Sequence, residues 1–243
     1  MTIFDAVAEE YDAGRPSYPD ALYDALGPLD AKRVLELGAG TGVATRQLLG
    51  RGASLVAVDA GSVVLARAVA RSPGLVALVG DGARLPLRDA SADLVCCAQS
   101  WHWLDPNARV AETHRVLGGG GRLAAWWSQT RADGEAWFDD YCAAVEAATD
   151  GGVRREQRDT DWGATIAVDG RFDVGDRIDV PWMRVVPIAL WLTDLSSHSW
   201  VAAMDPSPRA ALFDRLRAIL ESAFPDGDVR APHATSLWIA TKN

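Results

Sequence analysis

Three acidic residues stand at points where carboxylates can hold a polar ligand. Glu36 precedes a glycine-rich turn, Asp59 ends an apolar run, and Asp81 follows the next apolar run. A carboxylate accepts hydrogen bonds from hydroxyl and amine groups, and an ionised carboxylate also pairs with a cation. The three residues therefore predict a site for a ligand that carries hydroxyl, amine and ammonium groups.

The glycine-rich turn has the sequence Gly38-Ala39-Gly40-Thr41-Gly42. Glycines let the backbone approach a ligand closely, and the helix that follows presents free amides to it. Val43 stands where the dinucleotide-binding pattern G-x-G-x-x-G needs glycine or alanine. Three carboxylates would also repel a pyrophosphate. A ligand with a ribose for Asp59, an adenine for Asp81 and an amino-acid tail for Glu36 fits better.

The elements that position these residues are predicted from five apolar runs that alternate with amphipathic stretches. The runs cover residues 33–37, 54–58, 75–79, 94–98 and 123–127. Nearly continuous apolar strands are typical of a parallel sheet covered on both faces. In such a sheet ligands bind outside the carboxyl ends of the strands. The predicted fold class is α/β: a Rossmann-like, doubly wound sheet that is mostly parallel, with an antiparallel last strand.

Turn and capping residues predict the remaining elements. One helix is expected over residues 20–26, and Asp105-Pro106 is expected to open another that continues to Leu117 and ends at Gly118. In the second half, we expect a helix over 136–148, a strand over 176–186, a helix that begins at Ser207-Pro208 and a strand over 236–240.

No clear linker divides the chain, so we expect a single domain over residues 1–243. Its expected parts are an N-terminal lid and helix (1–30), a cofactor-binding core (31–127), a helical insertion that caps the substrate (128–231) and the last strand (232–243).

Composition limits the function further. The 243 residues carry a net charge of -9, and 49% of them are apolar. The acidic balance disfavours a nucleic-acid binder. Three cysteines, two of them adjacent, disfavour a disulfide framework or a zinc site. Without a signal-peptide pattern or an apolar run of membrane-spanning length, we expect a cytoplasmic protein that binds no membrane.

Several segments resemble one protein family in the same order along the chain. Residues 34–42 resemble motif I of class I S-adenosylmethionine-dependent methyltransferases, and residues 80–95 and 115–121 are similar to later motifs of that family. Residues 4–19 and 98–103 look like the small-molecule branch that includes trans-aconitate methyltransferase. Leu87, Ala92 and Gly119 depart from the family pattern, and none of them removes a cofactor-contacting carboxylate.

The resemblance implies S-adenosyl-L-methionine as cofactor and a small molecule as methyl acceptor. The expected cofactor-binding residues are Glu36, Gly38, Ala39, Gly40, Thr41, Asp59, Ala60, Asp81, Gly82, Ala83, Gln99 and Ser100. No metal is expected. The cofactor already carries an activated methyl group, so the protein must mainly align the acceptor and exclude water.

His102 is the candidate general base, and the alternative is a structural histidine. Trp101 and Trp103 flank it and are expected either to wall the methyl-transfer pocket or to fill the core. By resemblance, Tyr11, Arg15 and Tyr18 belong to an N-terminal lid over the cofactor, with a solvated arm as the alternative.

Three other functions compete with a small-molecule methyltransferase that acts on oxygen or nitrogen. A non-catalytic cofactor-binding protein of the same fold stays open. Val43, and Asp81 in addition to Asp59, disfavour a nicotinamide-dependent oxidoreductase. The segment Gln99-Ser100-Trp101-His102 lacks the motif expected of enzymes that methylate DNA amino groups. The predicted partner is therefore a small-molecule acceptor, without nucleic acid, and the predicted state is a monomer or homodimer.

Overall fold

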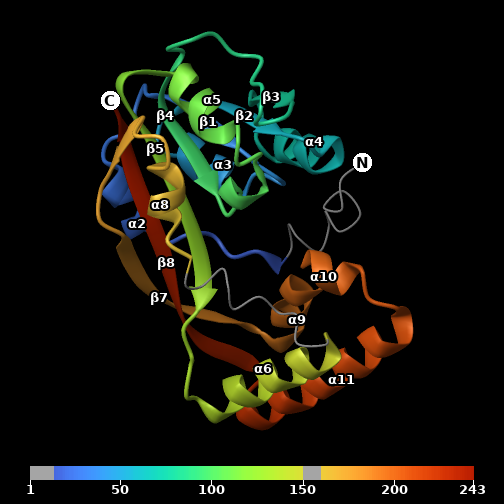
Figure 1. The fold of residues 1–243 in the computed structure, drawn as a ribbon. Coiled ribbons are helices and arrows are strands. Elements are labelled where there is room, and N and C mark those ends of the chain that lie inside the picture. The colour runs from blue at the N-terminus through green and yellow to red at the C-terminus, as the bar shows by residue number, and fades with distance from the viewer. Residues whose placement is uncertain (1–13, 150–159) are drawn as a thin grey trace.

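The computed structural model describes residues 14–149 and 160–243. In these residues eight strands form one sheet in the order β3-β2-β1-β4-β5-β8-β6, with β7 paired to β8 (Figure 1). The strands are β1 (Arg33–Leu37), β2 (Ser54–Asp59), β3 (Val76–Val79), β4 (Ala92–Ala98), β5 (Leu117–Thr130), β6 (Phe172–Val174), β7 (Ile178–Pro187) and β8 (Asp228–Lys242).

Helices connect the strands and extend beyond them. They are α2 (Asp20–Leu26), α3 (Val43–Leu49), α4 (Ser62–Arg71), the 3-10 turn η2 (Trp101–Trp103), α5 (Arg109–Val116), α6 (Ala136–Ala148), α8 (Trp162–Ile166), α9 (Ile188–Ser196), α10 (Ser199–Ala202) and α11 (Pro206–Ala223). The predicted bounds of β1, α2 and α6 agree with the structure to the residue.

The predicted parallel part of the sheet is confirmed. β1 pairs in parallel with β2 and β4, β2 with β3, and β4 with β5. The carboxyl ends of these strands therefore meet at one edge of the sheet, and β1 lies at the centre of it. The loops that follow β1 to β4 carry the residues expected to bind a cofactor.

The antiparallel part is larger than predicted. β8 is antiparallel to β5, as expected of the last strand, but β6 and β7 are also antiparallel to β8. β6 pairs with residues 240–242 and β7 with residues 228–237, so the two short strands share one edge of β8. β7 corresponds to the strand expected over residues 176–186, whereas β6 is a strand of the segment 128–231 that was not predicted.

The helix after η2 begins later than predicted. Asp105 was expected to cap it, but α5 begins at Arg109. The Asp105 carboxylate instead accepts a hydrogen bond from the Asn107 backbone amide at 2.9 Å, which forms a local turn that competes with the helix. The helix ends at Val116, and Leu117, expected to be helical, is the first residue of β5.

Apolar residues on β4 and β5 alternate between two cores. Val95 and Trp127 face one core, shared with α5 and α8, whereas Cys96 and Trp126 face the other, shared with α2 and α3. This period of two covers both faces of the sheet. A third core joins α6, α9 and α11, which lie together beyond one end of the sheet (Figure 1).

Candidate functional site

The glycine-rich turn joins β1 to α3. Gly38, Gly40 and Gly42 have φ angles of 70°, 56° and 83°, in the left-handed region that favours glycine. A Cβ atom on Gly38 would lie 2.4 Å from the Cβ of Ser100, so packing also requires glycine there. Ala39 and Thr41 are buried within the turn. The turn therefore lies tightly against the loop that follows β4.

Asp59 ends β2 and holds this turn in place. Its Oδ2 accepts a hydrogen bond from the Gly40 amide at 2.8 Å, and its Oδ1 accepts one from the Gly61 amide at 2.7 Å. Ala60, between them, is exposed. Each carboxylate oxygen accepts two hydrogen bonds, so this carboxylate can hold the two amides and also accept from hydroxyl groups of a ligand.

Glu36 is buried beneath the turn, with 1% of its surface exposed. Its Oε2 accepts a hydrogen bond from Thr45 Oγ1 at 2.5 Å, while Oε1 is buried without a hydrogen-bond partner in the described residues. Burial raises the pKa of Glu36 to about 7; the Thr45 bond opposes this rise and the charge of Asp59 adds to it. A cationic ligand group would supply both the missing hydrogen bond and a countercharge.

Asp81 lies at the same edge, two residues beyond β3. It is exposed, and its Oδ1 accepts a hydrogen bond from the Ala83 amide at 2.9 Å, so it also stabilises its own turn. Gly82 packs closely on Leu104, because a Cβ atom there would lie 2.5 Å from Leu104 Cδ2. The structure thus brings the carboxylates of Glu36, Asp59 and Asp81 to one edge of the sheet.

The loop after β4 completes this edge. Gln99 has a φ angle of 55°, and its backbone amide donates a hydrogen bond to the Trp126 carbonyl at 2.8 Å. Ser100 is buried, and its Oγ donates to the Leu37 carbonyl at 2.5 Å. Gln99 Nε2 also donates to the Tyr18 hydroxyl at 3.3 Å. The loop therefore connects the end of β1 with the N-terminal segment.

The N-terminal segment is attached to the core through Tyr18, which is buried. The Tyr18 amide donates to Gln47 Oε1 at 3.0 Å, and Gln47 Nε2 donates to the Tyr18 carbonyl at 2.8 Å. The ring meets Trp126 edge-on with centroids 5.7 Å apart. Arg15, nearer the N-terminus, pairs with Asp194 at 3.3 Å. Tyr11, also predicted for the lid, lies outside the described residues.

The same segment contacts the helices beyond the sheet. Arg184 donates from Nη1 to Asp194 Oδ2 at 2.6 Å and from Nη2 to the Gly14 carbonyl at 2.9 Å. Burial alone would raise the pKa of Asp194, but the charges of Arg15 and Arg184 hold it below its usual value. Burial also lowers the pKa of the neighbouring His198 to about 4. Residues 14–18 therefore connect the cofactor edge with β7 and α9.

Trp101 and Trp103 differ in their surroundings. Trp101 is fully buried in the core, which is the second of the two positions expected for it. Its Nε1 donates to Thr165 Oγ1 at 3.1 Å, and the Arg109 guanidinium lies over the ring and donates to the Trp101 carbonyl at 2.8 Å. Trp103 is 57% exposed at the surface of η2.

His102 lies between these tryptophans in a group of aromatic rings. Its ring centroid is 4.9 Å from that of Trp103 and 5.9 Å from that of Trp162. Trp162 stacks on Trp127 with centroids 4.4 Å apart, and Trp127 Nε1 donates a hydrogen bond to His102 Nδ1 at 3.3 Å. This bond assigns the proton of a neutral His102 ring to Nε2, which is then a donor.

Sequence reasoning missed Thr45, Gln47, Arg109 and Asp194. The polar side chains of Thr45 and Gln47 follow the glycine turn on α3, and Asp194 is the only charged residue of the apolar helix α9. A lone charge in an apolar helix is a usable signal of a buried ion pair. Its partners Arg15 and Arg184 lie far away in the sequence, so no local pattern indicates them.

The described ranges lack two kinds of feature. Within residues 14–149 and 160–243, no three histidine, cysteine or acidic side chains group together in a way that could hold a metal ion. Within the same ranges, none of the helices combines the length and apolar character that a membrane span needs.

Comparisons with known proteins identify the family to which this chain belongs. A family model described as a methyltransferase domain matches residues 35–125. An uncharacterised methyltransferase of Mycobacterium tuberculosis is 35% identical over 217 residues, which are 89% of this chain and 85% of that relative. This chain belongs to the class I S-adenosylmethionine-dependent methyltransferases. The matched segment contains Glu36, Asp59, Asp81 and His102 of this methyltransferase.

Solved structures show the same fold. A proposed type II methyltransferase from Anaeromyxobacter dehalogenans is 24% identical, with a TM-score of 0.63 over 93% of this methyltransferase and 97% of that chain. Geranyl diphosphate methyltransferase, solved in complex with S-adenosylmethionine, is 16% identical, with a TM-score of 0.51 over 97% of this chain and 86% of that chain. The mixed sheet is therefore the Rossmann-like methyltransferase sheet.

Proposed function

We propose that this methyltransferase moves a methyl group from S-adenosylmethionine to an oxygen or nitrogen atom of a small molecule by in-line displacement. The observation that carries the proposal is the meeting of the glycine-rich turn with the carboxylates of Glu36, Asp59 and Asp81 at one edge of the sheet. These groups match the ammonium, hydroxyl and amine groups of the cofactor.

The residues at this edge fit the cofactor group by group. The buried Oε1 of Glu36, which has no hydrogen-bond partner in the described residues, would accept from the ammonium group of the cofactor. Asp59 would accept from the ribose hydroxyls, and the exposed Asp81 would accept from the exocyclic amine of adenine. When bound, the cofactor supplies a methyl group activated by a sulfonium.

The contribution of the protein is then alignment of the acceptor and exclusion of water. Residues 14–18 support both, because they link Gln99 at the cofactor edge, and Gln47 on α3, to Asp194 on α9. We propose that the acceptor binds between this segment, η2 and the helices beyond the sheet. The exposed Trp103 ring offers an apolar face there, and an aromatic face also attracts a cationic sulfonium.

We propose that His102 orients the acceptor rather than removing its proton. Trp127 already donates to His102 Nδ1, so the ring can donate from Nε2 to an acceptor oxygen. The predicted role as general base would require this bond to break. An acceptor atom that is already deprotonated, such as a carboxylate oxygen, needs no base.

Calorimetric titration tests the cofactor assignment. We expect S-adenosylmethionine and its demethylated product to bind, and NADH not to bind. Asp59→Ala should weaken binding of the demethylated product by about 1–3 kcal/mol, or roughly 5- to 150-fold, through loss of charge-assisted hydrogen bonds. Asp214→Ala, an exposed substitution on α11, is the matched control and should leave affinity unchanged. Binding of NADH, or no binding of either sulfur ligand to folded protein, would overturn the assignment.

Acceptors can be screened by mass spectrometry with isotope-labelled S-adenosylmethionine, and the acceptor found then tests His102. His102→Gln keeps a donor near the position of Nε2, whereas His102→Ala removes it. An orienting role predicts that His102→Gln keeps most of kcat/KM while His102→Ala loses it. A base role predicts that kcat/KM falls on the order of 100-fold or more in both variants. It also predicts that the acidic limb of the wild-type pH profile is absent from the profiles of both variants.

A further inference from the structure

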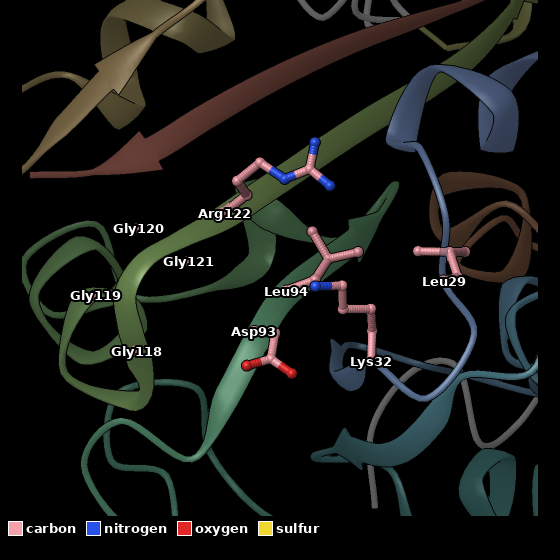
Figure 2. A pocket seen from close by; sticks show the side chains of 9 residues that line it. All are labelled: Leu29, Lys32, Asp93, Leu94, Gly118, Gly119, Gly120, Gly121 and Arg122. Atoms are coloured by element: carbon pink, nitrogen blue, oxygen red, sulfur yellow. The ribbon is translucent and has the colours of Figure 1, made fainter.

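A pocket of about 170 Å³ lies at the edge of the sheet opposite to Glu36 and Asp59. It opens between the loop that leads into β1 and the first residues of β4 and β5. Figure 2 shows the Lys32 side chain reaching toward Leu94 with Asp93 beside it, and the Arg122 guanidinium beyond Leu94, turned away from the loop of residues 118–121. The proposed methyl transfer does not use this edge.

A local change in strand pairing builds the pocket. Ala92 pairs with Leu117, but Leu94 pairs with Arg122, so β5 has three more residues than β4 between the two pairs. Gly118–Gly121 form the resulting bulge, and a Cβ atom on Gly119 or Gly120 would have no atom within 4 Å. The bulge therefore presents backbone, without side chains, to any molecule in the pocket.

The charges around the pocket are predominantly positive. The Lys32 ammonium makes no ion pair in the described part of the chain. Arg122 is fixed by a hydrogen bond from Nη2 to the Leu26 carbonyl at 2.6 Å, which anchors its guanidinium beside the pocket. In a protein with a net charge of -9, this pocket thus has two cations that form no ion pair within residues 14–149 and 160–243.

The carboxylate of Asp93, which lines the pocket, pairs with Arg33, and the charge of Lys32 also acts on it. Asp93 is held by Arg33, whose Nη2 and Nε donate to its two oxygens at 2.5 and 3.2 Å, and this pairing lowers the pKa of Asp93. The Asp30 side chain points toward Gly52: a Cβ atom on Gly52 would lie 2.5 Å from Asp30 Oδ1. The Lys32 ammonium and the remaining Arg122 donors are thus available to a ligand.

We propose that this pocket binds a small oxyanion, a phosphate or a carboxylate group, between Lys32 and Arg122. The volume is well below the roughly 300–1,000 Å³ of sites for drug-sized ligands, so the pocket fits one such group and a few waters. Arginine and lysine are the side chains that bind such groups through charge-assisted hydrogen bonds.

NMR titration of the full chain with inorganic phosphate, and separately with acetate, tests the proposal and separates the two chemistries. We expect the amide signals of Gly118–Gly121 to shift with at least one ion, with a Kd on the order of 1 mM. Lys32→Gln should weaken binding about tenfold, and Lys32→Glu should abolish it. Arg217→Gln, which removes an exposed charge on α11, should bind as the wild type does.

Lys32 is exposed, so its variants should fold, and their amide spectra in the absence of ligand verify this. The proposal is overturned if neither ion shifts the signals of residues 118–121 at tens of millimolar. It is also overturned if the shifts occur but are the same in Lys32→Glu as in the wild type.

Discussion

The buried carboxyl of Glu36 gives a measurable pH dependence of stability. Its pKa in the folded protein is raised from 4.5 to about 7, mainly by burial. In the unfolded chain this carboxyl ionises near its ordinary value, so between the two values the unfolded state releases a proton that the folded state retains. The stability that the protonated Glu36 provides is complete below the unfolded pKa and is lost as the pH rises through 7.

The magnitude follows from the shift. Each pKa unit is worth about 1.4 kcal/mol, so a shift from 4.5 to about 7 is worth about 3 kcal/mol. Glutamine at position 36 keeps the shape of the protonated acid and does not ionise. Relative to Glu36→Gln, the free energy of unfolding of the wild type should therefore fall by about 3 kcal/mol from pH 4.5 to 7 and then level off.

Urea unfolding at a series of pH values, without cofactor, measures this difference. Glu221→Gln, an exposed substitution on α11, is the matched control and should track the wild type at every pH. A difference between the wild type and Glu36→Gln that stays constant from pH 5 to 8 would refute the reasoning. Because the proposed cofactor ammonium stabilises the ionised form of Glu36, cofactor binding near pH 6.5 should also release a proton, which calorimetry in two buffers detects.

Three further predictions concern packing and positioning. Gly38→Ala should destabilise the protein by about 3 kcal/mol, against about 1 kcal/mol for Gly74→Ala, because both have a positive φ angle but only Gly38 lacks room for a Cβ. Equal losses in urea unfolding would contradict this. Asp194→Asn should lower the free energy of unfolding by about 3–5 kcal/mol at pH 7, because it breaks a buried ion pair. The difference from the wild type should shrink as the pH falls through the lowered pKa of Asp194. A loss of stability that does not depend on pH would contradict this prediction. Arg109→Met should lower kcat/KM for the acceptor about tenfold and leave cofactor affinity unchanged, because the Trp101 carbonyl loses its hydrogen-bond donor and η2 is held less firmly. Arg217→Met is the control. Equal activity of the two variants would exclude this positioning role for Arg109.

Local patterns in the sequence predict much of the fold. Continuous apolar runs predict the buried parallel strands, and the bounds of β1, α2 and α6 follow from hydrophobic periodicity and turn residues. The carboxylates of Glu36, Asp59 and Asp81 are predicted to share one edge because parallel strands point the same way. These features depend on residues that are near one another in the chain, or on a rule that holds for every such sheet.

The sequence by itself therefore determined the parallel core, the glycine-rich turn and the edge where the carboxylates meet. Only the tertiary structure decided that Trp101 lies in the core, that Trp127 donates to His102, and that Arg184 binds the carbonyl of Gly14, which is 170 residues away. Adjacent side chains of a strand point to opposite faces, so the sequence separates Trp126 from Trp127 but does not say what covers each face. Contacts between distant residues depend on how helices and loops pack together, and no local spacing encodes that packing.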